Sequence, residues 1–286
     1  MQVKTSVTTE SGADAKSGAD AKSGSGLEVT DVAIEYYVER HQAYFRAVDN
    51  ASFSVESGAF VSIIGPTGCG KSTLLRAIAG LVPYASGEIT WKGEPITVPG
   101  KDRAVVFQNP SLLPWRTVLR NAAYGLEGHG YRRAEAERRA KEMLEMVGLS
   151  QFADRYPHEL SGGMQQRVNI ARALAVDPDI LLLDEPFSAL DSQTREVMGG
   201  ELLRIWEATA KTAILITHQI DEAVFLSDSV VVLSAGPRSV VKHIVPITLD
   251  RPRDPELRRS AEFRALVDEI WNLTKSAWLQ TEQPAG

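Results

Sequence analysis

One stretch of nine residues has the composition and spacing of a phosphate-binding loop. Two glycines separated by four residues precede a lysine and a serine, and the run consists of Gly65, Pro66, Thr67, Gly68, Cys69, Gly70, Lys71, Ser72 and Thr73. Glycine-rich backbone can turn its N–H groups inward around an anion, the lysine can neutralise terminal phosphates, and the serine hydroxyl can ligate Mg²⁺. The stretch therefore predicts a site for a phosphate chain and its metal ion.

The loop is flanked by the elements that such a site requires. The apolar run FVSII precedes it at 60–64, and LLRAIA follows at 74–79 and stops at Gly80. A buried strand, a glycine-rich turn and a helix come in the order that presents free N–H groups and a positive helix end to a phosphate. The alternative is an ordinary glycine-rich turn with an exposed lysine, and the flanking elements argue against it.

Two adjacent carboxylates close another apolar run. Asp184 and Glu185 directly follow ILLL at 180–183, which is typical of a strand buried on both faces. Carboxylates in that position are costly to desolvate unless they bind a metal ion or handle protons. Because the strand gains nothing from them, the pair indicates chemistry and not structure.

Polar residues end two further predicted strands. Gln108 follows AVVF at 104–107, and His218 follows AILIT at 213–217. The carboxyl ends of strands in an open parallel sheet meet at one crevice, where such folds bind ligands. We therefore expect an α/β fold in which Lys71, Gln108, Asp184 and His218 share a single site.

A second helix start has features of an anion site. Ser161 is a good N-cap, and Gly162 and Gly163 leave the first N–H groups of the helix accessible. No lysine accompanies these residues, and taken alone they also fit an ordinary capped helix.

Aromatic residues upstream of the loop are candidates for stacking on a nucleotide base, because a base needs a flat apolar face. They are Tyr36, Tyr37, Tyr44 and Phe45, and each of them could instead pack a strand edge.

The loop at 109–115 combines two prolines with apolar residues, which favours a docking surface. Its Trp115 could equally anchor the core.

Composition narrows the class of protein. The chain has 286 residues, 43% of them hydrophobic, a formal net charge of −6 and one cysteine. No internal disulfide is possible, which fits a reducing cytoplasm, and the charge argues weakly against nucleic acid as a partner. We find no apolar run long enough for a membrane span and no signal peptide. Residues 1–26 repeat SGADAK and predict a disordered tail. Cys69 lies inside the predicted phosphate loop, so alkylation of its thiol is expected to compete with nucleotide binding.

These motifs closely resemble those of the ATP-binding subunits of ABC transporters, over about residues 27–245. Residues 65–73 resemble the family's Walker A motif, 180–184 its Walker B motif, 188–191 its D-loop and LSGGMQ at 160–165 its signature. The resemblance implies a P-loop NTPase core of RecA-like fold, an antiparallel β subdomain and an inserted α-helical signature subdomain. It places an ATPase domain at 27–250, with its helical part at about 109–175, and a C-terminal helical extension at 251–286.

The resemblance also implies a head-to-tail homodimer that holds two ATP molecules. Each γ-phosphate would lie between one chain's Walker A loop and the other's signature. Glu185 would accept the proton of the attacking water. His218 would hold Glu185 in register with the γ-phosphate. The implied metal residues are Ser72, Asp184 and Gln108, and the further nucleotide contacts are Tyr36, Ser161, Gly162, Gly163, Gln165 and Asp191.

Details of the sequence resemble importers for nitrate, sulfonates and taurine. They include LLPWRTV at 112–118 and RPR at 251–253 with the amphipathic segment that follows. The resemblance implies transmembrane permease partners, a periplasmic substrate-binding protein and a peripheral position on the cytoplasmic face of the inner membrane. Asn169 and Gln219 depart from common family patterns, although by motif neither reaches the site.

Other ABC classes fit less well. A DNA-repair ATPase would need a long coiled-coil insertion, a translation-type protein would carry two cassettes in one chain, and an inactive regulatory module would have lost Glu185 or His218. A different importer or an exporter stays open as an alternative.

Overall fold

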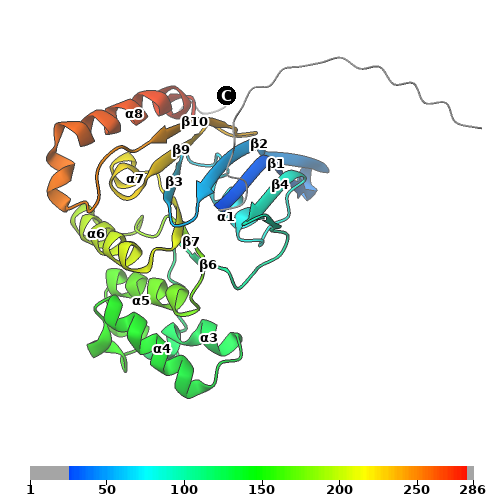
Figure 1. Cartoon of the computed structure of the whole chain (residues 1–286). Coiled ribbons are helices and arrows are strands. Elements are labelled where there is room, and N and C mark those ends of the chain that lie inside the picture. Colours follow the sequence, from blue (N-terminus) through cyan, green and yellow to red (C-terminus); the bar gives the residue numbers. More distant parts are fainter. Residues whose placement is uncertain (1–25, 282–286) are drawn as a thin grey trace, which may run out of the picture.

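A six-stranded sheet forms the centre of the molecule (Figure 1). The computed structural model describes residues 26–281. Five strands are parallel in the order β9–β3–β8–β7–β6, and β10 pairs antiparallel with β9. The strands are β3 Phe60–Ile64, β6 Arg103–Val106, β7 Ile180–Asp184, β8 Thr212–Ile216, β9 Ser229–Leu233 and β10 Val241–Pro246. The expected α/β fold with a parallel sheet is confirmed.

The continuous apolar runs become strands because both faces of this sheet are covered. Leu182 in β7 packs into the core shared with α1 (Lys71–Ile78), whereas its neighbours Leu181 and Leu183 pack into the core on the other face. Side chains alternate across a strand, so a strand buried on both sides needs apolar residues at every position. All five residues of β3, β7 and β8 are accordingly buried.

A second, antiparallel sheet has the order β2–β1–β4–β5 and covers α1 from its other side. Its strands are β1 Gly26–Val38, β2 Ala43–Glu56, β4 Ser86–Trp91 and β5 Glu94–Pro95. The apolar residues at 27–29, 33–34 and 51–55 by themselves predict only short antiparallel strands, whereas β1 and β2 are 13 and 14 residues long. Of the predicted tail, residues 1–25 lie outside the described part of the chain, and Gly26 already belongs to β1.

The chain between β6 and β7 forms a helical lobe, drawn in green at the foot of Figure 1. Its helices are α2 Val118–Ala122, α3 Tyr124–Gly128, α4 Arg133–Met146 and α5 Gly162–Ala175. In α4 the spacing of Ala136, Ala140 and Leu144 places all three on the buried face, while most of the other positions are charged. The lobe packs against the core without joining either sheet.

Three more helices cover the remaining face of the central sheet, and they are α6 Ser192–Thr209, α7 Ile220–Leu226 and α8 Ala261–Thr281. The buried Arg253 fixes the end of α7, because its guanidinium donates to the carbonyls of Val224, Phe225 and Ser227 at 2.9–3.2 Å. Donors at this position satisfy carbonyls that a helix end leaves unpaired. Among residues 26–281, no helix is long and apolar enough to cross a membrane.

Candidate active site

The loop between β3 and α1 adopts the tight turn that its glycines predict. Gly68 and Gly70 have φ of +78° and +95°, a region that residues with a Cβ rarely adopt. A Cβ at Gly70 would also lie 2.9 Å from Val48 Cγ2. The loop lines an open pocket together with Glu185 and the aromatic rings of Tyr36 and Phe45.

Lys71 is the charged centre of this loop. Its side chain is only 6% exposed, and Nζ donates to the carbonyl oxygens of Gly65 and Pro66 at 2.8 and 3.0 Å. Within residues 26–281, no carboxylate forms an ion pair with it. A buried ammonium held by two carbonyls and left without a counter-ion is poised to bind an anion.

Ser72 and Asp184 meet across the gap between α1 and β7. Ser72 Oγ donates to Asp184 Oδ1 at 2.7 Å, and the carboxylate is 6% exposed. Mg²⁺ prefers hard oxygen ligands, keeps several of its waters and is usually bound through one or two carboxylates. This hydroxyl and carboxylate beside the phosphate loop fit such an ion.

Glu185 follows Asp184 in a strained backbone conformation. Its φ of +46° lies in the left-handed region, and its N–H donates to the carbonyl of Ile216 in β8 at 2.9 Å. Left-handed conformations of residues other than glycine cluster at functional sites. Glu185 Oε2 lies 3.3 Å from Nδ1 of His218, so the ends of β7 and β8 present a carboxylate and an imidazole as a pair.

Gln108 lies after β6, beside the segment that follows Glu185. Its Nε2 donates to Ser188 Oγ at 2.9 Å, and that hydroxyl donates to the carbonyl oxygen of Glu185 at 3.0 Å. Gln108 is exposed and is not among the residues that line the pocket. Ser188 was not among the predicted site residues, because its role depends on a contact between segments 80 residues apart.

The four candidate aromatic residues separate into two pairs. Tyr36 and Phe45 are opposite each other in the β1–β2 ladder and both line the pocket. Tyr37 and Tyr44 instead pack edge to face, with ring centroids 5.3 Å apart. The structure thus leaves Tyr36 and Phe45 as the rings that face the phosphate loop.

The predicted signature residues do not line this pocket. Ser161 caps α5, and its Oγ accepts a hydrogen bond from the N–H of Met164 at 3.3 Å. Gln165 is turned back toward its own lobe, where its amide donates to the carbonyls of Pro157 and Leu160. Gly162 and Gly163 form the first turn of the helix. These residues form a second surface on the helical lobe.

Asp191 is another helix cap. Its carboxylate accepts from the N–H of Thr194 at 3.0 Å at the start of α6. Hydrogen bonds from the side chain and backbone of Thr194 hold the pKa of Asp191 below its ordinary value. Asp191 is therefore an anion, and it does not line the phosphate-loop pocket of its own chain.

One expectation needs correction, and one of the alternatives left open by the sequence is excluded. The Cys69 thiol is fully buried, and burial raises its pKa, so an alkylating reagent has no access to it in this conformation. Its carbonyl accepts from Ser239 Oγ, a contact that fixes the loop from the β10 side. Trp115 is 72% exposed and is not a core anchor. The buried Asn121 holds the Trp115 loop instead, with its amide bonded to Leu113 and Arg116.

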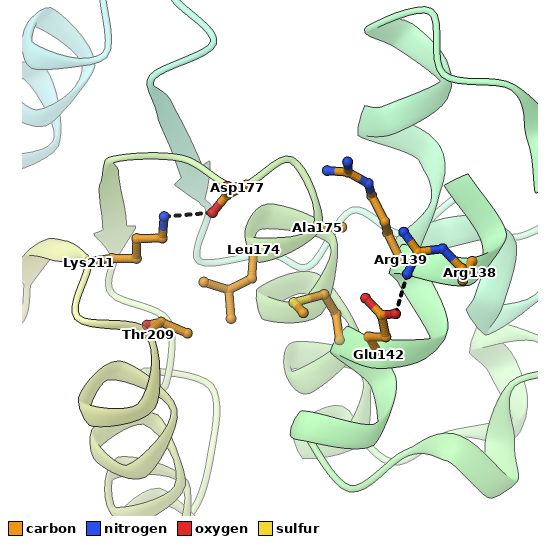
Figure 2. A pocket seen from close by; sticks show the side chains of 9 residues that line it. Arg138, Arg139, Glu142, Leu174, Ala175, Asp177, Thr209 and Lys211 are labelled. Carbon is orange, nitrogen blue, oxygen red and sulfur yellow. Dashed lines mark hydrogen bonds and ion pairs between the residues drawn. The ribbon is translucent and has the colours of Figure 1, made fainter. Parts of the chain in front are cut away.

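A different cleft lies between the helical lobe and the core (Figure 2), and none of the predicted catalytic residues lines it. Its charged groups are all paired, and Arg139 pairs with Glu135 outside the cleft. Lys211 Nζ lies 2.6 Å from Asp177 Oδ1, and Arg138 Nη1 lies 2.5 Å from Glu142 Oε1. The cleft is a gap between two packed parts of the chain, separate from the phosphate loop.

Comparisons with known proteins agree with this geometry. Residues 48–188 match the family model for the ABC transporter. The chain is 52% identical to the taurine import ATP-binding protein TauB of Rhizobium johnstonii, over 74% of this chain and 80% of that protein. It is 46% identical to the nitrate import ATP-binding protein NrtD of Synechococcus elongatus, over 73% and 77%.

A solved structure shares the fold. An ATP-binding cassette captured as a dimer in a post-hydrolysis state, with ADP and Pi bound, is 33% identical and superposes with a TM-score of 0.68. The match covers 78% of this chain and all of that one. The chain therefore belongs to the family of ABC transporter ATP-binding proteins, whose members hydrolyse ATP to power transport.

Proposed function

We propose that this chain is the ATP-hydrolysing subunit of an importer for a small organic or inorganic anion, such as nitrate, a sulfonate or taurine. The main support is that Lys71, Ser72 and Glu185 line one pocket, while Asp184 is hydrogen-bonded to Ser72 and His218 lies against Glu185. The names of the taurine and nitrate import relatives support the substrate class. A subunit of a different importer or exporter, or a non-transport ABC ATPase, is the alternative.

In this proposal the γ-phosphate lies against Lys71 and the N–H groups of residues 68–73. Ser72 and Asp184 would hold Mg²⁺, and Gln108 would contact either this ion or the attacking water. When bound, the ion would supply charge compensation on the phosphate oxygens. Glu185 takes the proton of the water, a role typically worth about 10²–10⁴ in rate. His218 holds that carboxylate in place. Tyr36 or Phe45 stacks on adenine.

The site is completed by a second copy. Residues 161–163, with Gln165 and Asp191, would close on the nucleotide bound by the partner chain and form an ATP sandwich. Residues 161–163 and Gln165 lie on the helical lobe and Asp191 caps α6, and within residues 26–281 none of them lines the phosphate-loop pocket, which supports this. A related cassette captured as a dimer with ADP and Pi gives further support.

The loop at 109–115 is the proposed contact with the transmembrane permease subunits. Trp115 lies exposed on a loop whose backbone at Leu113 is hydrogen-bonded to the buried Asn121, so the loop has a defined position for a partner to bind. The chain would then sit peripherally on the cytoplasmic face of the inner membrane. A periplasmic substrate-binding protein would act indirectly, through the permease, and no nucleic acid would take part. We propose domain limits of 27–250 for the ATPase, about 109–175 for its helical part and 251–286 for the extension.

The experiment is hydrolysis by the purified full-length chain with Mg-ATP, alone and with a permease co-expressed from the same operon. We expect Glu185→Gln to keep ATP binding and to lose turnover by about 10²–10⁴. Failure to copurify with a permease while turnover persists would favour the non-transport alternative. Turnover of the Glu185→Gln variant at the unmodified rate would remove Glu185 from the mechanism.

A further inference from the structure

The helix that begins at the signature also holds the loop that carries Gln108. Asn169, in the middle of α5, is only 1% exposed, and its Nδ2 donates to the carbonyl of Phe107 at 3.3 Å. Arg172, one turn further along, donates from Nη2 to Asn169 Oδ1 at 2.6 Å. The same guanidinium donates to the carbonyls of Pro110 and Ser111 at 2.8 and 3.2 Å.

These contacts fix the backbone on both sides of Gln108. Two side chains of one helix bind the carbonyl before Gln108 and two carbonyls shortly after it. Loss of one of these partners would leave a polar group in the interface unsatisfied, which typically costs about 1–3 kcal/mol. The loop position is therefore set by α5 and not by β6 alone. We call Asn169 and Arg172 the α5 latch.

The latch lies on a rigid element. Asn169 is eight residues beyond Ser161, or roughly 12 Å along the axis at the rise of an α-helix. A helix of this length moves as a rod, so displacement of its first turn is carried to its middle. The later part of the same loop is bonded to Asn121 of α2, which also belongs to the helical lobe. The lobe thus holds the loop at two places.

We propose that Asn169 and Arg172 are positioning residues, which make the Gln108 loop move with the signature helix. When the signature of one chain closes on ATP bound by its partner, the latch carries that movement to Gln108 and to the loop of Trp115 in the same chain. The inference rests on the proposed function, because the latch can affect hydrolysis only if Gln108 takes part in it. It gives Asn169, which by motif seemed remote from the site, a direct contact with the residue before Gln108.

The test compares Asn169→Ala and Arg172→Ala with Arg167→Ala. Arg167 is the matched control, since it lies on the same helix and donates to a backbone carbonyl, that of Val147, but does not touch the loop. We expect both latch variants to speed amide hydrogen exchange in the segment 107–113, with no change in the segment 65–73. Arg167→Ala should leave both segments unchanged. Arg172→Lys keeps the positive charge but has fewer hydrogen-bond donors, so its exchange rate in 107–113 should lie between those of the unmodified chain and Arg172→Ala. This milder variant keeps the test usable if Arg172→Ala fails to fold.

Kinetics separate positioning from general destabilisation. The latch variants should lower kcat for ATP by roughly ten- to a hundredfold, as small misplacements near chemistry do, with KM changed less than about twofold. Combined with Gln108→Ala, a latch variant should add little further loss, because both act through one group. Full additivity with Gln108→Ala, or unchanged exchange in 107–113, would overturn the inference.

Failure of the proposed function has a different signature. If Gln108→Ala hydrolyses ATP normally, the role given to Gln108 is wrong, and the latch with it. If Gln108→Ala is impaired while both latch variants are normal, the proposed function stands and only the latch is refuted.

Discussion

Nδ1 of His218 lies 3.3 Å from Oε2 of Glu185, across the ends of two neighbouring parallel strands. The distance is at the long end of a hydrogen bond, and such contacts often tighten when substrate binds. A histidine in this position can orient the carboxylate toward a water and reach the γ-phosphate at the same time. The pair therefore joins the proposed base to the residue proposed to hold it in register with the γ-phosphate.

Loss of that imidazole should slow hydrolysis without loss of ATP binding. We expect His218→Ala to lower kcat at least about tenfold, because Glu185 is no longer held in register. The measurement is steady-state phosphate release alongside nucleotide affinity by calorimetry. His243→Ala is the control, since His243 is exposed on β10, away from the pocket. An equal loss in the two variants would contradict the role of His218.

Ser72 should govern the response to magnesium. Ser72→Ala removes the hydroxyl that donates to Asp184, and with it one predicted metal ligand. We expect the Mg²⁺ concentration for half-maximal hydrolysis to rise about tenfold or more, in line with the loss of one ligand from a site of few protein ligands. Ser54→Ala, on the exposed side of β2, should titrate like the unmodified chain. An unchanged magnesium requirement in Ser72→Ala would argue against this metal site.

Glu222 should make stability depend on pH. It is 5% exposed beside Thr217, which donates to it, and burial raises its pKa to about 7. The hydrogen bond from Thr217 lowers this pKa, Asp221 raises it, and Arg195 and Arg258 lower it. Because the pKa is raised above the unfolded value, the folded chain holds the extra proton, and stability falls as pH rises from about 4.5 through about 7.

The variant Glu222→Gln tests this linkage. It removes the ionisation and keeps a polar group for Thr217, so it should unfold at a higher temperature than the unmodified chain at pH 8 and at a similar one at pH 5. The shift of the pKa corresponds to a loss of about 3 kcal/mol in the free energy of unfolding between low and high pH. Thermal unfolding at both pH values measures it. A difference that is independent of pH would show that Glu222 does not titrate in this range.

Trp115 should matter to assembly and not to the chain itself. It is 72% exposed, so Trp115→Ala should change the free energy of unfolding by no more than about 0.5 kcal/mol and leave the ATPase of the isolated subunit intact. Copurification with the permease should fall. Val197→Ala, at another exposed apolar position, should copurify normally. Full assembly of the Trp115→Ala variant would move the docking surface elsewhere.

The central sheet and the site residues at its strand ends could be predicted from the sequence. Buried parallel strands such as β7 need an apolar residue at every position, and that requirement is visible as a continuous run ending at Asp184. The antiparallel strands were underestimated, because β1 carries register shifts after Val29 and exposed aromatic residues toward its end. Local pattern cannot show that such a segment still pairs with a partner.

Contacts between distant segments could not be predicted. Asn169 and Phe107 are 62 residues apart, and their hydrogen bond depends on how the helical lobe packs on the core. The same is true of Gln108 with Ser188, and of Ser239 with the loop at Cys69. Exposure was also ambiguous for Trp115, since an apolar residue between prolines fits either a core or a docking surface.

A nucleotide site shared between two copies of the chain requires that the copies associate only when ATP is bound, so ATP-dependent association is the decisive measurement. Sedimentation of Glu185→Gln should show a dimer with Mg-ATP and a monomer with ADP. Adding Gly162→Glu should abolish the dimer while ATP binding by each chain persists. The fold has room for this change, since a Cβ at Gly162 meets only Leu190 Cδ2 at 3.8 Å.

Gly200→Glu controls for the added charge, because a Cβ there meets nothing within 4 Å and the position lies on α6. It should leave the Glu185→Gln dimer intact. With Mg-ATP we expect a dimer for Glu185→Gln with or without Gly200→Glu, and a monomer with Gly162→Glu. A dimer that persists with Gly162→Glu, or a monomeric Glu185→Gln chain at saturating ATP, would contradict it.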